Sequence, residues 1–213
     1  FGDAVNEAAQ VLNIKGRVIP VTLHNTTLHA RLVDGSLIHG ETNIDIPLHN
    51  PTVPIKMVWL HTPASINPDA RQAILAADMI VIGPGDLYTS LIPNLLVRGV
   101  AAAIKKSKAK KVYVCNLMTK FGETHGFKGQ DFVDAIERYL GKNILDYAIF
   151  NKRRPSPDVL KHYLNENSHF VDVGDLDLKN RKPRHVLADL LDSGRFVRHN
   201  PRKKLAKLII SLL

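Results

Sequence analysis

The sequence predicts an α/β fold with a mainly parallel, doubly wound sheet and a small antiparallel excursion. Between residues 67 and 150, short apolar runs alternate with helix-forming stretches, a pattern typical of parallel strands that are buried on both faces. Asp34-Gly35 separates two alternating runs and predicts a hairpin. The 213 residues are 45% hydrophobic, so we expect one domain with a sizeable core.

The first predicted elements lie before residue 77. We expect a helix over 3–12, a strand over 17–23, a hairpin joining 28–32 to 37–41, and a strand over 55–60. Asn67 and Pro68 predict a helix that runs to residue 76, because Asn caps helix N-termini and Pro suits the first turn.

The central segment follows a strand–helix–strand–helix–strand pattern. Strands are predicted over 79–82, 111–116 and 147–150, and helices over 89–97, 100–106 and 130–140. A helix opening at 155–158 and running to 164, short strands near 169–173 and 185–187, and a basic helix over 202–213 complete the chain. We interpret 151–213 as a basic extension of a single domain that spans 1–213.

The formal charge of +9 is concentrated near the C-terminus. Ten Lys and Arg lie between Lys179 and Lys207, against Asp189 and Asp192. Such a segment is able to contact nucleic acid or another polyanion. Phe196 is the only Phe, Tyr or Trp among these charges, which favours a solvated basic helix, and nucleic acid is not the expected partner.

Composition also bears on the compartment. The single cysteine, Cys115, lies within a predicted strand, so no internal disulfide can form and a reducing cytoplasm is expected. Because no run of about eighteen apolar residues occurs, the sequence predicts a soluble protein without a membrane span.

A glycine-rich turn follows the apolar strand over 79–82. Gly83-Pro84-Gly85-Asp86 leads into a helix with hydroxyl residues near its start. Glycines allow a backbone to approach a ligand closely, and the unpaired amides of a helix N-terminus favour anions. The turn therefore predicts a phosphate cradle, although such turns also occur as plain chain reversals.

Polar residues follow three predicted strands, at 83–86, 116–119 and 151–154. Ligands of open parallel sheets bind beyond the carboxyl ends of the strands. Amides and hydroxyls there, with a nearby Lys or Arg, would suit a nucleotide or a sugar phosphate. Asn116 and Asn151 are equally able to act only as turn caps.

The segment 122–127 is a second candidate site. Its Glu123, Thr124 and His125 are able to bind a metal, accept a proton or hydrogen-bond a sugar hydroxyl, or to form a plain surface loop. No His or Cys spacing suggests zinc, whereas Mg²⁺ needs only one or two carboxylates. No nucleophile elbow or Walker lysine occurs, so no catalytic residue is assigned.

Several segments together resemble a known family. Residues 83–97, 111–119 and 122–124, supported by 16–22, 34–35, 40–44 and 199–206, resemble the gluconeogenesis-factor (YvcK-like) family of the 2-phospho-L-lactate transferase (CofD-like) fold group. The resemblance implies a Rossmann-like sheet. It also implies that a first glycine-rich βα unit precedes residue 1, so that the domain is N-terminally incomplete.

This resemblance implies a cytoplasmic regulatory protein that binds a UDP-sugar such as UDP-N-acetylglucosamine and links central carbon metabolism to cell-wall synthesis and cell shape. A homo-oligomer or a regulatory protein partner would fit that role. One alternative is a CofD-like transferase that acts on a lactyl-diphosphate donor with Mg²⁺ held partly by Asp86. Another is a protein- or RNA-interaction module that uses the basic tail.

Carried over by position, the implied ligand-binding residues form one set. They are Gly83, Pro84, Gly85, Asp86, Tyr88, Thr89, Asn94, Asn116, Thr119, Glu123 and Thr124. The carboxylate of Asp86 would repel an anionic ligand, so we expect a cation beside it.

Overall fold

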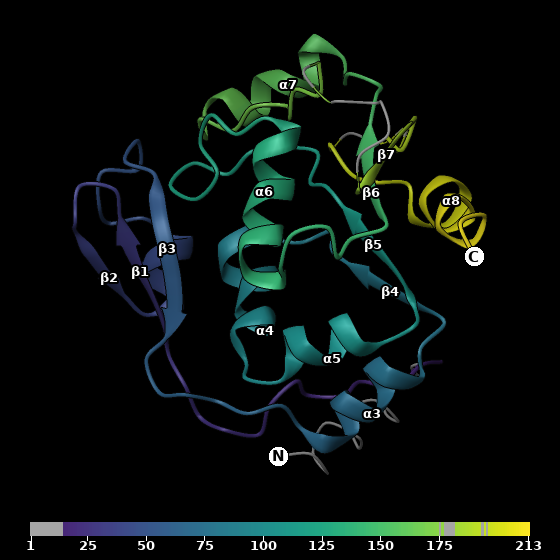
Figure 1. The fold of residues 1–213 in the computed structure, drawn as a ribbon. Helices are drawn as coiled ribbons and strands as arrows, with labels where there is room; N and C mark the ends of the chain where they lie inside the picture. Colours follow the sequence, from purple (N-terminus) through teal and green to yellow (C-terminus); the bar gives the residue numbers. More distant parts are fainter. Residues whose placement is uncertain (1–14, 175, 177–181, 193, 195) are drawn as a thin grey trace.

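The computed structural model describes residues 15–174, 176, 182–192, 194 and 196–213. Within them, β4 (Met79–Ile82), β5 (Lys110–Val114), β6 (Tyr147–Asn151) and β7 (Arg184–Ala188) form a parallel sheet in that order. The antiparallel sheet has the order β2-β1-β3, with β1 (Leu28–Leu32), β2 (Leu37–His39) and β3 (Ile55–Leu60). Figure 1 shows the small sheet to one side of the helices that cover the large one. The predicted fold class is confirmed.

Both faces of the parallel sheet are covered. On one face, Tyr113 and Phe150 belong to the main hydrophobic core with α4 (Ile92–Leu96), α5 (Val100–Lys106) and α6 (Gly129–Leu140). On the other face, Val112 and Ile149 pack with Leu205, Leu208 and Ile209 around α8 (Ala206–Ile210). Side chains alternate between faces along a strand, so the unbroken apolar runs are explained by a core on each side.

Cys115 directly follows β5 and lies in the first of these cores. Burial raises the pKa of its thiol to about 12. The thiol is therefore protonated at neutral pH, and it behaves as a small apolar side chain rather than as a nucleophile.

The predicted hairpin is confirmed, and a third strand pairs with it to form a small sheet. In its turn, Asp34 accepts a hydrogen bond from the backbone amide of Ser36 at 2.9 Å, and His29 pairs with His39 across the strands. The strand over 55–60, which had no predicted partner, pairs antiparallel with β1. Its Val58 amide donates to the Tyr139 hydroxyl at 2.9 Å, which joins the small sheet to α6.

Two predictions in the N-terminal part are wrong. The segment 17–23 is not a strand, because its polar groups bond a loop instead: Thr22 donates to the Ser65 carbonyl at 2.7 Å, and the Val21 carbonyl accepts from Asn67. Residues 40–41 do not extend β2 but lead into α2 (Glu41–Asp45). The helix predicted over 3–12 lies outside the described residues.

Most other helices begin where the sequence predicts. Asn67 caps α3 (Pro68–Ala76) by accepting from the Asp69 amide, and α7 (Pro157–Leu164) begins at a proline. The helix predicted over 89–97 instead starts as the π-helical turn η1 (Leu87–Leu91), which leads into α4. The C-terminal helix likewise opens with a π-helical turn, η2 (Pro201–Leu205), before α8.

The region around 169–173 forms no strand. It makes one isolated bridge, between Met118 and Phe170. The short strand predicted over 185–187 is confirmed as β7, the fourth strand of the parallel sheet. Among the helices that the structure describes, none combines the length and the apolar character required to cross a membrane.

Candidate functional site

An open cleft of about 720 Å³ lies at the carboxyl ends of β4 and β5. One wall comes from the segments that follow these two strands, and the other comes from the end of α7, the residues that follow it and the C-terminal segment. Its lining residues are Pro84, Gly85, Asp86, Asn116, Leu117, Met118, Thr119, Lys120, Tyr163, Glu166, Ser168, Val197, Arg198, His199, Pro201 and Leu205. This edge is where open parallel sheets bind ligands.

The glycine turn after β4 is shaped by the neighbouring strand. Gly83 has a φ of +86°, and a Cβ there would lie 2.8 Å from the carbonyl oxygen of Val114. Only glycine fits both the dihedral angle and the space. Beyond it, the side-chain oxygen of Asn116 accepts a long hydrogen bond of 3.4 Å from the Gly85 amide, which joins the ends of β4 and β5.

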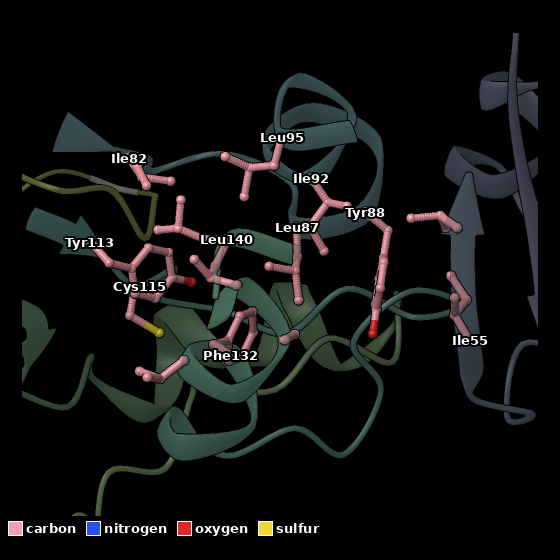
Figure 2. Close-up of a cluster of buried hydrophobic side chains, with 14 of the residues drawn as sticks. Ile55, Ile82, Leu87, Tyr88, Ile92, Leu95, Tyr113, Cys115, Phe132 and Leu140 are labelled. Atoms are coloured by element: carbon pink, nitrogen blue, oxygen red, sulfur yellow. The ribbon is translucent and has the colours of Figure 1, made fainter. Parts of the chain in front are cut away.

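Glu123 binds Tyr88 and Thr89, two residues that the sequence predicted to bind a ligand. It is 2% exposed, and its carboxylate accepts hydrogen bonds from the Tyr88 amide and the Thr89 hydroxyl, both at 3.1 Å. The Tyr88 ring is equally buried and lies in the core between η1 and β3 (Figure 2), edge-on to Phe127. The start of η1 is therefore bound internally.

Lys120 is the cation that Asp86 requires. Its ammonium group bonds Asp86 at 2.8 Å, Glu123 at 3.1 Å and also Asp45, at the end of α2. Partial burial works to lower the pKa of Lys120, but hydrogen bonds to Asp45 and Asp86 outweigh it and raise that pKa above its ordinary value. Burial raises the pKa of Glu123, against the opposing effect of Lys120.

The same three carboxylates are the candidate ligands for a divalent cation. Asp45, Asp86 and Glu123 each offer an oxygen within 4.8 Å of the others. Carboxylate oxygens suit Mg²⁺, which would neutralise phosphate oxygens of a substrate. The ammonium of Lys120 already bonds all three side chains. These carboxylates therefore fit Mg²⁺ only when the Lys120 ammonium moves away from them.

The opposite wall contributes Arg198 and His199. The Arg198 guanidinium lies 5.2 Å from the centre of the Phe196 ring. Burial lowers the pKa of His199, against a hydrogen bond to the backbone of Cys115, so the imidazole is neutral at pH 7. Its Nε2 is buried without a hydrogen-bond partner among the described residues. This wall therefore supplies one cation and one neutral imidazole.

The structure divides the predicted ligand-binding set. Pro84, Gly85, Asp86, Asn116 and Thr119 line the cleft. Gly83, Tyr88, Thr89, Asn94, Glu123 and Thr124 do not. Asn94 is exposed on α4 and donates to the Ser90 carbonyl, while Thr124 accepts from the Lys120 amide at 2.9 Å and holds that turn.

The third predicted strand end does not reach this cleft. The side chain of Asn151 donates to the Arg153 carbonyl at 2.6 Å and accepts from the Leu190 amide at 2.9 Å. Arg153 bonds Asp189 and lines a separate hollow of about 220 Å³. Asn151 therefore acts as a turn cap, the alternative that the sequence left open.

Sequence reasoning missed the residues that complete the cleft. Lys120 belongs to a loop without a recognisable motif, and no pattern singled out Tyr163, Glu166 or Ser168. The concentration of basic residues near the C-terminus identified Arg198 as one of many charges, but it did not indicate that Arg198 lines the cleft. In that tail, Lys204 bonds Asp189 at 2.9 Å, so part of its charge is neutralised internally. Binding of RNA or a protein by this segment stays a prediction.

Comparisons with known proteins agree with this architecture. The family model described as 2-phospho-L-lactate transferase CofD matches residues 1–191. A Thermotoga maritima protein is 44% identical over 207 residues, covering 95% of this chain and 64% of the relative. The gluconeogenesis factor of Bacillus subtilis is 35% identical over 215 residues, covering 100% of this chain and 66% of the relative.

The fold is also found among solved structures. A crystal structure of a UPF0052-family protein from Bacillus halodurans superposes with a TM-score of 0.89 at 36% identity, covering 98% of this chain and 66% of that one. The chain thus spans about two thirds of the length of these proteins. On the family model, these relatives and the shared fold, the chain belongs to the gluconeogenesis-factor/CofD-like family.

Proposed function

We propose that the cleft binds a nucleotide sugar of the UDP-N-acetylglucosamine type and that the protein has a regulatory role, linking central carbon metabolism to cell-wall synthesis and cell shape. The observation that carries the proposal is the position of the cleft, beyond the carboxyl ends of two parallel strands and opposite Arg198. Its volume of about 720 Å³ falls within the range of small-molecule sites.

The charges of the two walls suggest how such a ligand would lie. Asp86 lines one wall of the cleft and shares a single ammonium group, that of Lys120, with Asp45 and Glu123. This side of the cleft therefore has excess negative charge and favours neutral hydroxyl groups over phosphate. Arg198, on the opposite wall, is suited to bind phosphate oxygens through two parallel hydrogen bonds. We therefore place the diphosphate toward Arg198, and the sugar toward Asp86 and Asn116.

The neutral His199 gives the base or sugar a further partner. Its unpartnered Nε2 is able to accept a hydrogen bond from a hydroxyl or an imide N–H. A buried acceptor without a partner costs free energy, and a bound ligand would relieve that cost. This favours a ligand that combines an anionic group with hydrogen-bond donors, as a nucleotide sugar does.

Calorimetric titration of the protein with UDP-N-acetylglucosamine tests the proposal. We expect Arg198→Ala to weaken binding about 10- to 100-fold, because a hydrogen bond to a charged group contributes about 1.5–3 kcal/mol. Arg184→Ala is the matched control, since Arg184 begins β7 and does not line the cleft. Absence of binding heat, or equal binding by Arg198→Ala, would contradict the proposal.

The carboxylate cluster supports a second candidate function. Asp45, Asp86 and Glu123 are oxygen ligands of the kind that Mg²⁺-dependent transferases use, and the matching family model is described as a 2-phospho-L-lactate transferase. Incubation with a lactyl-diphosphate donor, a deazaflavin acceptor and Mg²⁺ would test it. Product that is lost in Asp86→Asn would support transfer, and absence of product with the wild-type protein would exclude this reaction.

A further inference from the structure

We propose that His29, His39 and His61 form a transition-metal site on the solvent-facing side of the small antiparallel sheet. Nothing in the proposed function involves these residues, and none of them lines the cleft. His29 and His39 are direct partners on β1 and β2. His29 also pairs with Trp59 on β3, and His61 lies two residues after Trp59, directly after the end of that strand. The period of two places all four side chains on one face.

The separation of the first two histidines matches a metal-ligand pair. The Nδ1 atoms of His29 and His39 lie 3.3 Å apart. Two nitrogens that are each about 2.0–2.1 Å from a tetrahedral zinc ion are separated by about 3.3–3.4 Å. The two imidazoles are therefore spaced as ligands of one ion, and one Nδ1 must lose its proton for the ion to bind.

His61 supplies a third imidazole at close range. Its ring stacks on that of His29 with 4.7 Å between centroids and 18° between planes. This ring must rotate about its side-chain bonds to turn a nitrogen toward the ion. His61 and His39 are both exposed, so both rings border solvent and a metal is able to enter from water.

Imidazole nitrogens are ligands that suit Zn²⁺, Cu²⁺ and Ni²⁺. One nearby charge bears on how tightly such an ion would bind. Arg31 lies on the same face, 5.9 Å from the centre of the Trp59 ring. Its charge opposes cation binding and should moderate the affinity.

Trp59 provides a direct readout of this site. It is the only tryptophan of the chain, and its ring centroid lies 5.7 Å from that of His29. Cu²⁺ bound to the cluster would quench the fluorescence of an indole that close. Zn²⁺ does not quench, but binding to the folded state alone should raise the melting temperature of the protein.

The experiment is a Cu²⁺ titration of the full chain followed by Trp59 fluorescence. We expect saturable quenching, at least tenfold weaker Cu²⁺ binding in His39→Gln and at least threefold weaker binding in His61→Gln. His162→Gln is the control, because His162 is exposed on α7, outside the small antiparallel sheet. Zn²⁺ should raise the melting temperature of the wild type and of His162→Gln, but not that of His39→Gln. Equal Cu²⁺ affinity in either cluster variant, or an equal effect of Zn²⁺ on His39→Gln, would overturn the proposal.

Discussion

The buried carboxylate of Glu123 accepts a hydrogen bond from the backbone amide of Tyr88 at 3.1 Å. It thereby holds the 119–124 loop against the start of η1, which directly follows in sequence the glycine turn that lines the cleft. A charged acceptor satisfies an amide of the first helical turn, which is otherwise an orphan donor. The cleft wall therefore depends on a residue that does not line it.

Replacement of Glu123 by Ala should destabilise the protein by about 2–3 kcal/mol, because it removes hydrogen bonds to a charged group and leaves the Tyr88 amide buried without a partner. Urea unfolding measures this loss. Asp158→Ala is the control, since Asp158 belongs to an exposed ion pair with Lys161, and its removal should change the stability by less than about 1 kcal/mol. An equal effect of the two variants would contradict the structural role of Glu123.

Replacement of Lys120 by Met should make the protein sensitive to divalent cations. Without the ammonium group, Asp45, Asp86 and Glu123 have no counter-charge among themselves. We expect a loss of about 2–3 kcal/mol, below the full cost of breaking a buried ion pair because the Lys120 side chain is 30% exposed. Millimolar Mg²⁺ should restore part of the melting temperature.

The wild type and Lys161→Met, which alters an exposed lysine on α7, should respond little to Mg²⁺. Thermal unfolding with and without Mg²⁺ measures the difference. If Lys120→Met and the wild type respond alike, the ammonium of Lys120 does not occupy a cation position.

Replacement of Gly83 by Ala should cost more stability than replacement of Gly126 by Ala. Both glycines have positive φ, which costs an L-residue about 1–2 kcal/mol. A Cβ at Gly83 would in addition lie 2.8 Å from the Val114 carbonyl, whereas nothing lies within 4 Å of one at Gly126. We expect a further cost of about 1–3 kcal/mol at Gly83. Chemical denaturation of both variants measures this difference, and equal losses would show that the close approach is unimportant.

The stability of the protein should depend on His199 in mildly acidic solution. Burial lowers the pKa of His199 below its ordinary value of 6.5. A lowered pKa means that the folded state disfavours the proton, so the contribution of this group is present above pH 6.5 and is lost as the pH falls through the folded-state value.

Between about pH 7 and pH 5, the wild type should therefore lose more unfolding free energy than His199→Gln, which does not titrate in this range. His162→Gln should retain the wild-type profile. Urea unfolding at several pH values measures both. A steeper loss in His199→Gln than in the wild type would reverse the predicted sign.

The local elements could be read from the sequence because short-range interactions encode them. The apolar run 79–82 predicted a buried parallel strand, Asn67-Pro68 predicted the start of α3, and Asp34-Gly35 predicted the hairpin turn. Each of these signals depends on residues within a few positions of one another. The fold class follows from the same short-range information. So does the position of the cleft at the carboxyl edge of the sheet.

Only the tertiary structure decided which polar groups meet. Lys120 bonds Asp45, 75 residues earlier in the chain, and Asp86, 34 residues earlier. Arg198 and His199 reach the cleft from the C-terminal segment. Periodicity and turn chemistry show which face of an element is buried, but they do not specify which side chain of another element will pair with a buried charge. These pairings depend on how complete elements pack against one another. For this reason Glu123, which was predicted to contact a ligand, instead supports the cleft wall through Tyr88.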